Sequence, residues 1–150
     1  MGVEVSIVIS ETGAGAYSYG WTKLEALEAW RDVIDADPDL SDALAHAGVS
    51  STELLCSGIS FASVRINDTD DTWTGETPMG NHSKFWIVDN RAFYVGSQNL
   101  YISNLFEWGL LVDDPTVTEE ILDRYWTPLW SYAARSAVSG PAAGGSCVLN

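Results

Sequence analysis

Residues 82–99 read HSKFWIVDNRAFYVGSQN. The apolar runs in this segment predict one strand over residues 84–88 and a second over residues 92–95. The three residues between the runs, Asp89-Asn90-Arg91, are typical of a tight turn. The segment therefore predicts a β-hairpin whose two strands pair with each other.

Polar residues with useful chemistry stand at the open end of this hairpin. The pattern is His-x-Lys, four residues, Asp, six residues and Gly-Ser-x-Asn, and it fixes His82, Lys84, Asp89, Ser97 and Asn99. Alternate residues of a strand share a face, so His82 should lie beside Lys84, and Ser97 beside Asn99. We expect these four side chains to converge, while Asp89 ties the turn through hydrogen bonds.

This group of side chains is suited to attack on an anionic phosphodiester. Lys84, Ser97 and Asn99 would hold phosphate oxygens, while His82 attacks phosphorus or protonates the leaving group. The second imidazole nitrogen then needs an acceptor, for which Glu107 is the candidate, although that carboxylate could have another partner. The chemistry requires no cofactor and no metal. Each residue alone has an ordinary structural explanation; their joint spacing favours the site.

Strands and helices are also predicted on both sides of the hairpin. Further strands are expected over residues 3–9, 59–66 and 106–112, the last of them buried on both faces. Helices are expected from Thr22, which forms a capping box with Glu25, over residues 41–46, and from Pro115, with Pro128 bending or ending that helix. This succession predicts an α/β fold in which helices flank a mixed β-sheet.

The domain limits follow from length and composition. The chain has 150 residues, enough for one domain, which we expect over residues 1–136. Residues 137–150 are rich in Gly and Ala and predict a tail. The first predicted strand begins within two residues of Met1, so we expect an N-terminally truncated part of a longer architecture.

The net charge of −14, from seven basic and 21 acidic residues, restricts the partners. Such a charge repels nucleic acid and favours neutral or zwitterionic substrates, or a basic partner. No apolar run approaches the roughly 18 to 20 residues that a membrane-spanning helix needs. The first five residues also lack the basic and apolar regions of a signal peptide.

The two cysteines, Cys56 and Cys147, leave two interpretations open. Cys56 could be a small buried apolar residue. Alternatively, the pair could form a bridge that pins the tail to the domain and implies an oxidising compartment.

The pattern of residues 82–99 resembles the HKD motif of the phospholipase D superfamily. Further stretches resemble the C-terminal half of secreted microbial phospholipase D enzymes of the actinomycete type; they are residues 2–10, Cys56 with the strand after it, and residues 93–101. The resemblance implies a single, N-terminally truncated phospholipase D-type half-domain carrying one HKD motif in residues 1–136.

The resemblance also implies a mechanism and roles for residues. In this family two half-domains each supply one motif, one histidine becomes a phosphohistidine, and the other acts as acid and then base. His82 would be the second of these histidines, Lys84, Ser97 and Asn99 would bind phosphate, and Glu107 would support His82. A disulfide between the two cysteines and a secreted protein are implied as well.

One departure from the family is large, because this sequence contains one motif and lacks the first motif of the family. Its other histidine, His46, is followed by Ala47 and Gly48. We therefore expect a phospholipid substrate together with a homodimer mate or a separate N-terminal half. The leading hypothesis is a phosphodiesterase that hydrolyses or transfers phospholipid head groups. The alternatives are a catalytically incomplete fragment or interaction module and, disfavoured by the acidic charge, a dimeric nuclease of the superfamily.

Overall fold

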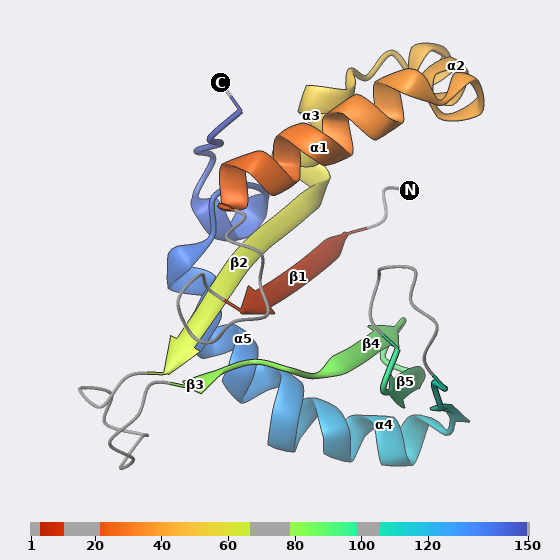
Figure 1. Ribbon diagram of the computed structural model, residues 1–150, viewed down its shortest axis with the longest axis vertical. Helices are drawn as coiled ribbons and strands as arrows, with labels where there is room; N and C mark the ends of the chain where they lie inside the picture. The colour runs from red at the N-terminus through yellow and green to blue at the C-terminus, as the bar shows by residue number, and fades with distance from the viewer. Residues whose placement is uncertain (1–3, 11–21, 67–78, 99–105, 150) are drawn as a thin grey trace. The chain divides into compact units, whose positions relative to one another are not determined.

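The computed structural model describes residues 4–10, 22–66, 79–98 and 106–149. Helices and strands are mixed, as expected for an α/β protein (Figure 1). The chain divides into two compact units, a first unit of Met1–Asn81 with Tyr132–Asn150 and a second unit of His82–Ser131. The described strands pair in two three-stranded sheets, and not in the one mixed sheet that the sequence predicts. Periodicity identifies strands but does not say which strands pair.

The sheet of the first unit is built around β2 (Ile59–Ile66). β1 (Val5–Ser10) pairs with it in parallel, from Val5 opposite Ile59 to Ser10 opposite Val64. β3 (Met79–Gly80) pairs with the other edge of β2 in the antiparallel sense. Parallel neighbours require a long crossover connection, and the described residues between β1 and β2 form three helices (Figure 1).

The first of these helices, α1 (Lys23–Ala36), begins at the predicted capping box. The Glu25 backbone N–H donates to Thr22 Oγ1 at 3.2 Å, and the Thr22 backbone N–H donates to Glu25 Oε2 at 2.7 Å. Two hydrogen bonds from Thr22 lower the pKa of Glu25 below its usual value. The bond from the Thr22 backbone has the larger effect, and the bond from its hydroxyl has the smaller one. This prediction is confirmed because a cap depends only on residues three apart.

The other two helices differ from the predictions. α2 (Pro38–Ala47) begins earlier than residue 41, because the Asp37 side chain caps it and Pro38 fills the first position, where no N–H is needed. α3 (Ser51–Gly58) was not predicted. Its signal in the sequence is Ser50, whose Oγ accepts from the Glu53 N–H at 3.1 Å.

The core of the first unit lies between α1, α3 and β2. Four buried apolar side chains from these elements form it: Ala26, Leu27, Leu55 and Phe61. Trp30 packs on the Phe61 ring with centroids 4.9 Å apart. The helical spacing of Leu27 and Trp30 thus turns one face of α1 onto the sheet.

The C-terminal strap, residues 137–149, is tied to β2 and α3. The Val138 N–H donates to the Phe61 carbonyl oxygen at 3.0 Å, and the fully buried Ser139 hydroxyl donates to that of Ile59 at 2.7 Å. A disulfide joins Cys56 to Cys147, so of the two cysteine interpretations the structure shows the bridge. The short helices η2 (Ala134–Ser136) and η3 (Pro141–Ala143) complete this region.

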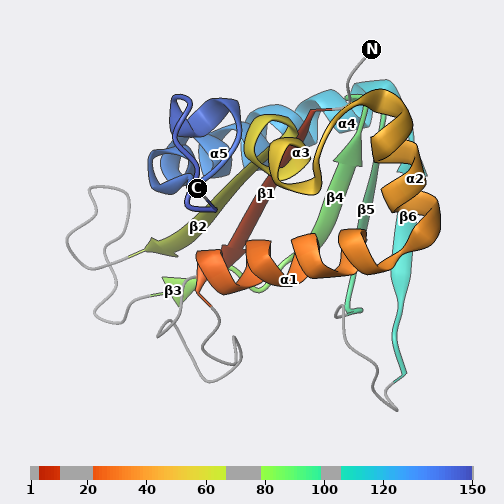
Figure 2. The ribbon, with the colours of Figure 1, turned by 90° about the horizontal axis from the view of Figure 1, so that it is seen from above.

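The second unit carries an antiparallel sheet in the order β4 (Lys84–Val88), β5 (Ala92–Gly96) and β6 (Gly109–Asp113), side by side in Figure 2. The predicted hairpin is confirmed, with the Arg91 N–H donating to the Val88 carbonyl oxygen at 3.0 Å. Asp89 and Asn90 have φ angles of 51° and 55°. Asp and Asn tolerate this left-handed conformation better than most residues, which explains their place in the turn.

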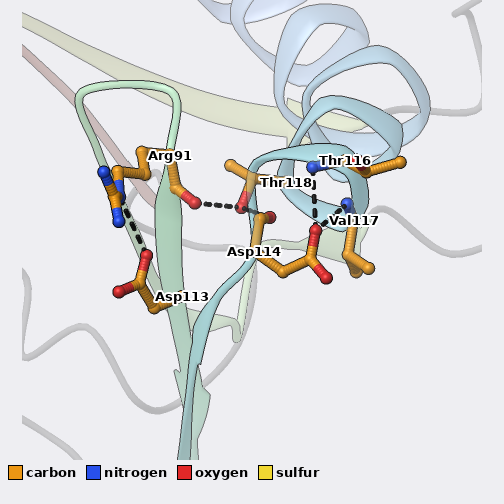
Figure 3. Close-up of polar contacts among 6 residues, drawn as sticks. All are labelled: Arg91, Asp113, Asp114, Thr116, Val117 and Thr118. Atoms are coloured by element: carbon orange, nitrogen blue, oxygen red, sulfur yellow. Dashed lines mark hydrogen bonds and ion pairs between the residues drawn. The ribbon is translucent and has the colours of Figure 1, made fainter.

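A polar network joins the turn end of the sheet to the next helix, α4 (Pro115–Ile121) (Figure 3). Arg91 Nε lies 3.0 Å from Asp113 Oδ1, and this carboxylate raises the pKa of Arg91 by hydrogen bonding and by charge. The buried Thr118 hydroxyl donates to the Arg91 carbonyl oxygen at 2.9 Å. Asp114 caps α4 by accepting from the backbone N–H groups of its first turn.

The prediction of a doubly buried strand at residues 106–112 is wrong. β6 begins at Gly109, and Leu110 and Leu111, which point to opposite faces, are 54% and 61% exposed. Among the described strands, β6 pairs with β5 alone and forms the edge of its sheet. An apolar run indicates a strand but does not reveal its position in the sheet.

The helical segment after α4 contains a wide turn. A π-helical turn, η1 (Leu122–Trp126), is followed by α5 (Thr127–Ala133), and the Thr127 N–H donates to the Leu122 carbonyl oxygen five residues back. The helical segment continues through Pro128, so this proline does not end it. The turn directly before Pro128 is the wide π-helical one and not a regular α-helical turn. None of the helices in the described residues is long and apolar enough to cross a bilayer.

Candidate functional site

His82 and Lys84 form a close pair at the start of β4. Lys84 Nζ lies 3.0 Å from each ring nitrogen of His82 and donates to the His82 carbonyl oxygen, also at 3.0 Å. An ammonium only donates and a neutral imidazole has one acceptor nitrogen, so Lys84 can donate to only one of the two ring nitrogens at a time. His82 is exposed and Lys84 is half-buried, so the imidazole is open to solvent while the ammonium is held against the backbone.

The sheet explains the glycine of the motif. Lys84 lies opposite Gly96 in the β4–β5 pairing, and Gly96 lies opposite Gly109 in the β5–β6 pairing. A Cβ on either glycine would collide with the Tyr94 ring, and one on Gly96 would also meet the Trp108 carbonyl oxygen. The glycine therefore leaves room for an aromatic ring beside the strand that opens with Lys84.

Ser97 and Glu107 form a second close pair. The Ser97 hydroxyl donates to Glu107 Oε2 at 2.5 Å and accepts from the Trp108 N–H at 3.0 Å. The Ser97 N–H donates to the Trp108 carbonyl oxygen at 2.9 Å, which extends the β5–β6 pairing by one residue. Ser97 therefore makes three hydrogen bonds, and its hydroxyl donates to the Glu107 carboxylate.

Two of the predicted site residues stand apart from these pairs. Asn99 lies outside the described residues. Asp89 is in the turn, at the end of β4 away from Lys84, about 16 Å along a strand of five residues. Its place supports the structural role expected for it, because the turn requires a residue that accepts a positive φ.

The structure thus brings the predicted residues together in two pairs on neighbouring segments. His82 contacts Lys84, Ser97 contacts Glu107, and Ser97 follows the residue opposite Lys84. That all of these groups meet on one phosphate, and that Glu107 orients His82, stays a prediction. The described ranges contain no group of three or more His, Cys, Asp or Glu side chains arranged to hold a metal ion.

One contact at this site was not predicted. The Tyr125 hydroxyl donates to Ser83 Oγ at 2.6 Å, between His82 and Lys84 in the chain. Tyr125 falls on the apolar stripe of a predicted helix, and that stripe indicated only packing. Nothing in the local sequence signals a contact between residues 42 positions apart.

The comparisons with known proteins bear on the family of the chain. No family model matches the chain. A phospholipase D from Streptomyces antibioticus is 30% identical to it over 140 residues, which are 92% of this chain and 24% of the relative. This similarity supports a relationship to phospholipase D, and the chain spans about a quarter of the relative's length.

Proposed function

We propose that the chain is a phospholipase D-type phosphodiesterase that hydrolyses or transfers phospholipid head groups. The observation that carries the proposal is the contact between His82 and Lys84 at the end of a well-defined hairpin. It joins a proton-transfer group or nucleophile to a fixed cation, and both groups are required for attack on a phosphodiester. The identity with a phospholipase D gives independent support.

The proposed reaction has two steps and uses a second histidine. In the first step that histidine attacks phosphorus, an N–P bond forms, the P–O bond to the head group breaks, and the His82 imidazolium gives its proton to the leaving alcohol. In the second step neutral His82 removes a proton from water or another alcohol. That oxygen attacks phosphorus, the N–P bond breaks, and phosphatidate or a new phospholipid leaves.

Lys84 would neutralise charge on the nonbridging oxygens in both steps. In the present structure its ammonium donates to the His82 ring and carbonyl oxygen. An anionic phosphate offers a stronger acceptor than either, because hydrogen bonds between charged partners are shorter and stronger. Substrate would therefore draw Lys84 from the imidazole and leave His82 available for proton transfer.

Ser97, Asn99 and Glu107 complete the proposed site. The Ser97 hydroxyl and the Asn99 carboxamide would donate to phosphate oxygens, and Glu107 would accept from the second nitrogen of His82. In this structure the Ser97 hydroxyl donates to Glu107. A bound phosphate would have to replace Glu107 as the acceptor of that hydrogen bond. The exchange would free the carboxylate for the imidazole.

The second histidine would come from outside this sequence. The sequence contains two histidines, and only His82 stands in a His-x-Lys pattern. A second copy of the chain or a separate N-terminal half would supply the missing motif. In a homodimer, His82 of one subunit would be the nucleophile and His82 of the other the acid.

The test is activity of the purified chain on phosphatidylcholine and on bis(p-nitrophenyl) phosphate, with its mass in solution measured in parallel. His82→Ala and Lys84→Ala should each lower turnover by about 100-fold or more, as expected for loss of an acid–base or charge-stabilising group. His46→Ala is the matched control and should retain activity, and chelators should have no effect. Equal activity in the His82 and His46 variants would refute the proposal.

A second candidate is a catalytically incomplete module that binds a partner. The single His-x-Lys pattern favours it, because a phosphohistidine mechanism of this type uses two histidines. A strictly monomeric chain that is inactive alone and after mixing with an N-terminal half would support this candidate.

A further inference from the structure

The geometry points to Tyr125 as a positioning residue that holds the His82-Ser83-Lys84 segment in place, and this inference rests on the proposed function of His82 and Lys84. Tyr125 donates to Ser83 Oγ at 2.6 Å and is itself half-buried. Ser83 is flanked by the two residues that would carry the chemistry. A bond at that point restrains the backbone of both neighbours.

The tyrosine ring gives a second hold on the same strand. It meets the Phe85 ring edge-on, with centroids 5.1 Å apart and an angle of 81° between the planes. Phe85 in turn lies 5.7 Å from the ring of Phe93, which is buried. Edge-to-face contacts between aromatic rings are favourable beyond the area that they bury. Tyr125 is therefore connected to the packed side of the hairpin.

The two contacts also define which way the strand faces. Ser83 and Phe85 are alternate residues, and both contact Tyr125, so both point to its side. Lys84 lies between them and must point to the opposite side. Tyr125 thus contacts one face of this segment, and the Lys84 ammonium lies on the opposite face.

The wide helical turn presents the hydroxyl. Tyr125 lies inside η1, where one extra residue per turn rotates the following side chains relative to a regular helix. π-Helical turns occur frequently at functional sites, which agrees with a role beyond packing.

The hydrogen bond matters because the site must be held within a fraction of an ångström. A displacement of about 1 Å in a catalytic group can cost about 100-fold in rate. Without the Tyr125 hydroxyl, the segment would keep the ring contact with Phe85 but lose the restraint on Ser83. The contact of Lys84 with the His82 ring and carbonyl oxygen should loosen as a result.

The test uses the two histidines as internal probes. In ¹H–¹³C spectra of the purified full chain, His82→Ala assigns the ring resonances of His82 and leaves those of His46 as a reference. Tyr125→Phe and Ser83→Ala should each shift the His82 resonances and leave those of His46 in place. The double variant should match Ser83→Ala, because that change already removes the acceptor of the Tyr125 hydroxyl.

Two further variants act as controls. Ser83→Thr retains a hydroxyl and should resemble the wild type. Tyr132→Phe makes the same substitution on a ring of the first unit, one that lies 4.1 Å from the Arg135 guanidinium carbon, and should leave the His82 resonances unmoved. His82 resonances that stay unchanged in Tyr125→Phe would overturn the inference. Shifts of both histidines would also overturn it, because they would indicate a general disturbance.

Turnover provides the second readout. Tyr125→Phe should lower kcat by about tenfold and change KM by less than about twofold, since the hydroxyl orients a catalytic group and does not bind substrate. An unchanged kcat in an active enzyme would contradict the inference. If the wild-type chain and its mixtures show no phosphodiesterase activity, the proposed function fails, while the resonance measurements still decide whether Tyr125 positions His82.

Discussion

The Glu25 carboxylate illustrates how one residue can make stability depend on pH. It accepts from the Thr22 backbone and hydroxyl, and these bonds lower its pKa from the ordinary value of 4.5. A lowered pKa stabilises the folded state above the unfolded-state value, and this stabilisation is lost as pH falls through the folded-state value.

Glu25→Gln should therefore lower the free energy of unfolding at pH 7 and have a smaller effect below pH 4.5. Urea denaturation at several pH values measures the difference from the wild type. Glu28→Gln, which removes a carboxylate from the same helix outside the capping box, is the matched control. A difference from the wild type that is constant across pH would contradict the role of the ionised carboxylate.

At the scale of elements, the C-terminal strap depends on one glycine. Gly140 has a φ of 73° and ψ of −171°, and a Cβ there would lie 2.5 Å from the Ser60 nitrogen and 2.6 Å from the Ile59 carbonyl. Neither the backbone conformation nor the packing accepts a side chain. The strap can approach β2 this closely only because position 140 carries no side chain.

Gly140→Ala should lower the free energy of unfolding by about 3 kcal/mol, from backbone strain and overpacking together. Gly144→Ala is the matched control. It also has a positive φ, of 62°, but no atom within 4 Å of the added Cβ, so its cost should be about 1 kcal/mol. Denaturation of the oxidised chains compares the two, and equal effects would show that the close approach to β2 does not matter.

The elements also show how far local sequence signals reach. Thr22 with Glu25, Pro115 at a helix start, and the Asp89-Asn90-Arg91 turn are each predicted from residues within four positions, and all three predictions are confirmed. Such caps and turns depend on the local backbone alone. The exposure of β6 depends on its place in a sheet, which no local pattern records.

The predictions for the candidate site also differ between contacts of neighbouring residues and contacts that depend on tertiary packing. The spacing of His82 and Lys84 predicted their contact, because two residues apart on a strand is a local relation. Ser97 was expected to bind phosphate and Glu107 to accept from His82. In the structure, the Ser97 hydroxyl donates to the Glu107 carboxylate. Tyr125 reaches Ser83 only through the packing of a helix on a sheet, and a single sequence gives no measure of that packing.

At the scale of the whole molecule, the Cys56–Cys147 disulfide joins residues 91 positions apart. The loop that it closes contains the entire second unit. In the chain-entropy account, closing a loop of this size restricts the unfolded chain and stabilises the folded state by about 4 kcal/mol.

The double variant Cys56→Ser/Cys147→Ser should therefore lose about 4 kcal/mol of unfolding free energy, and reduction of the wild type should have a similar effect. Thermal and urea denaturation with and without a reductant measure both. The serine variant should not respond to the reductant. A wild-type chain that keeps its stability after complete reduction would show that the strap holds without the bridge.

The C-terminal strap also determines when β2 can complete its folding during synthesis. β2 leaves the ribosome before the strap, yet Ser60 and Ile59 bond to strap residues 82 and 80 positions later in the chain. At about 5–20 residues per second, those partners emerge several seconds afterwards. During that interval β2 lacks its final neighbours, while the second unit is being translated. Nascent chains should therefore need protection from aggregation until residues 138–147 emerge.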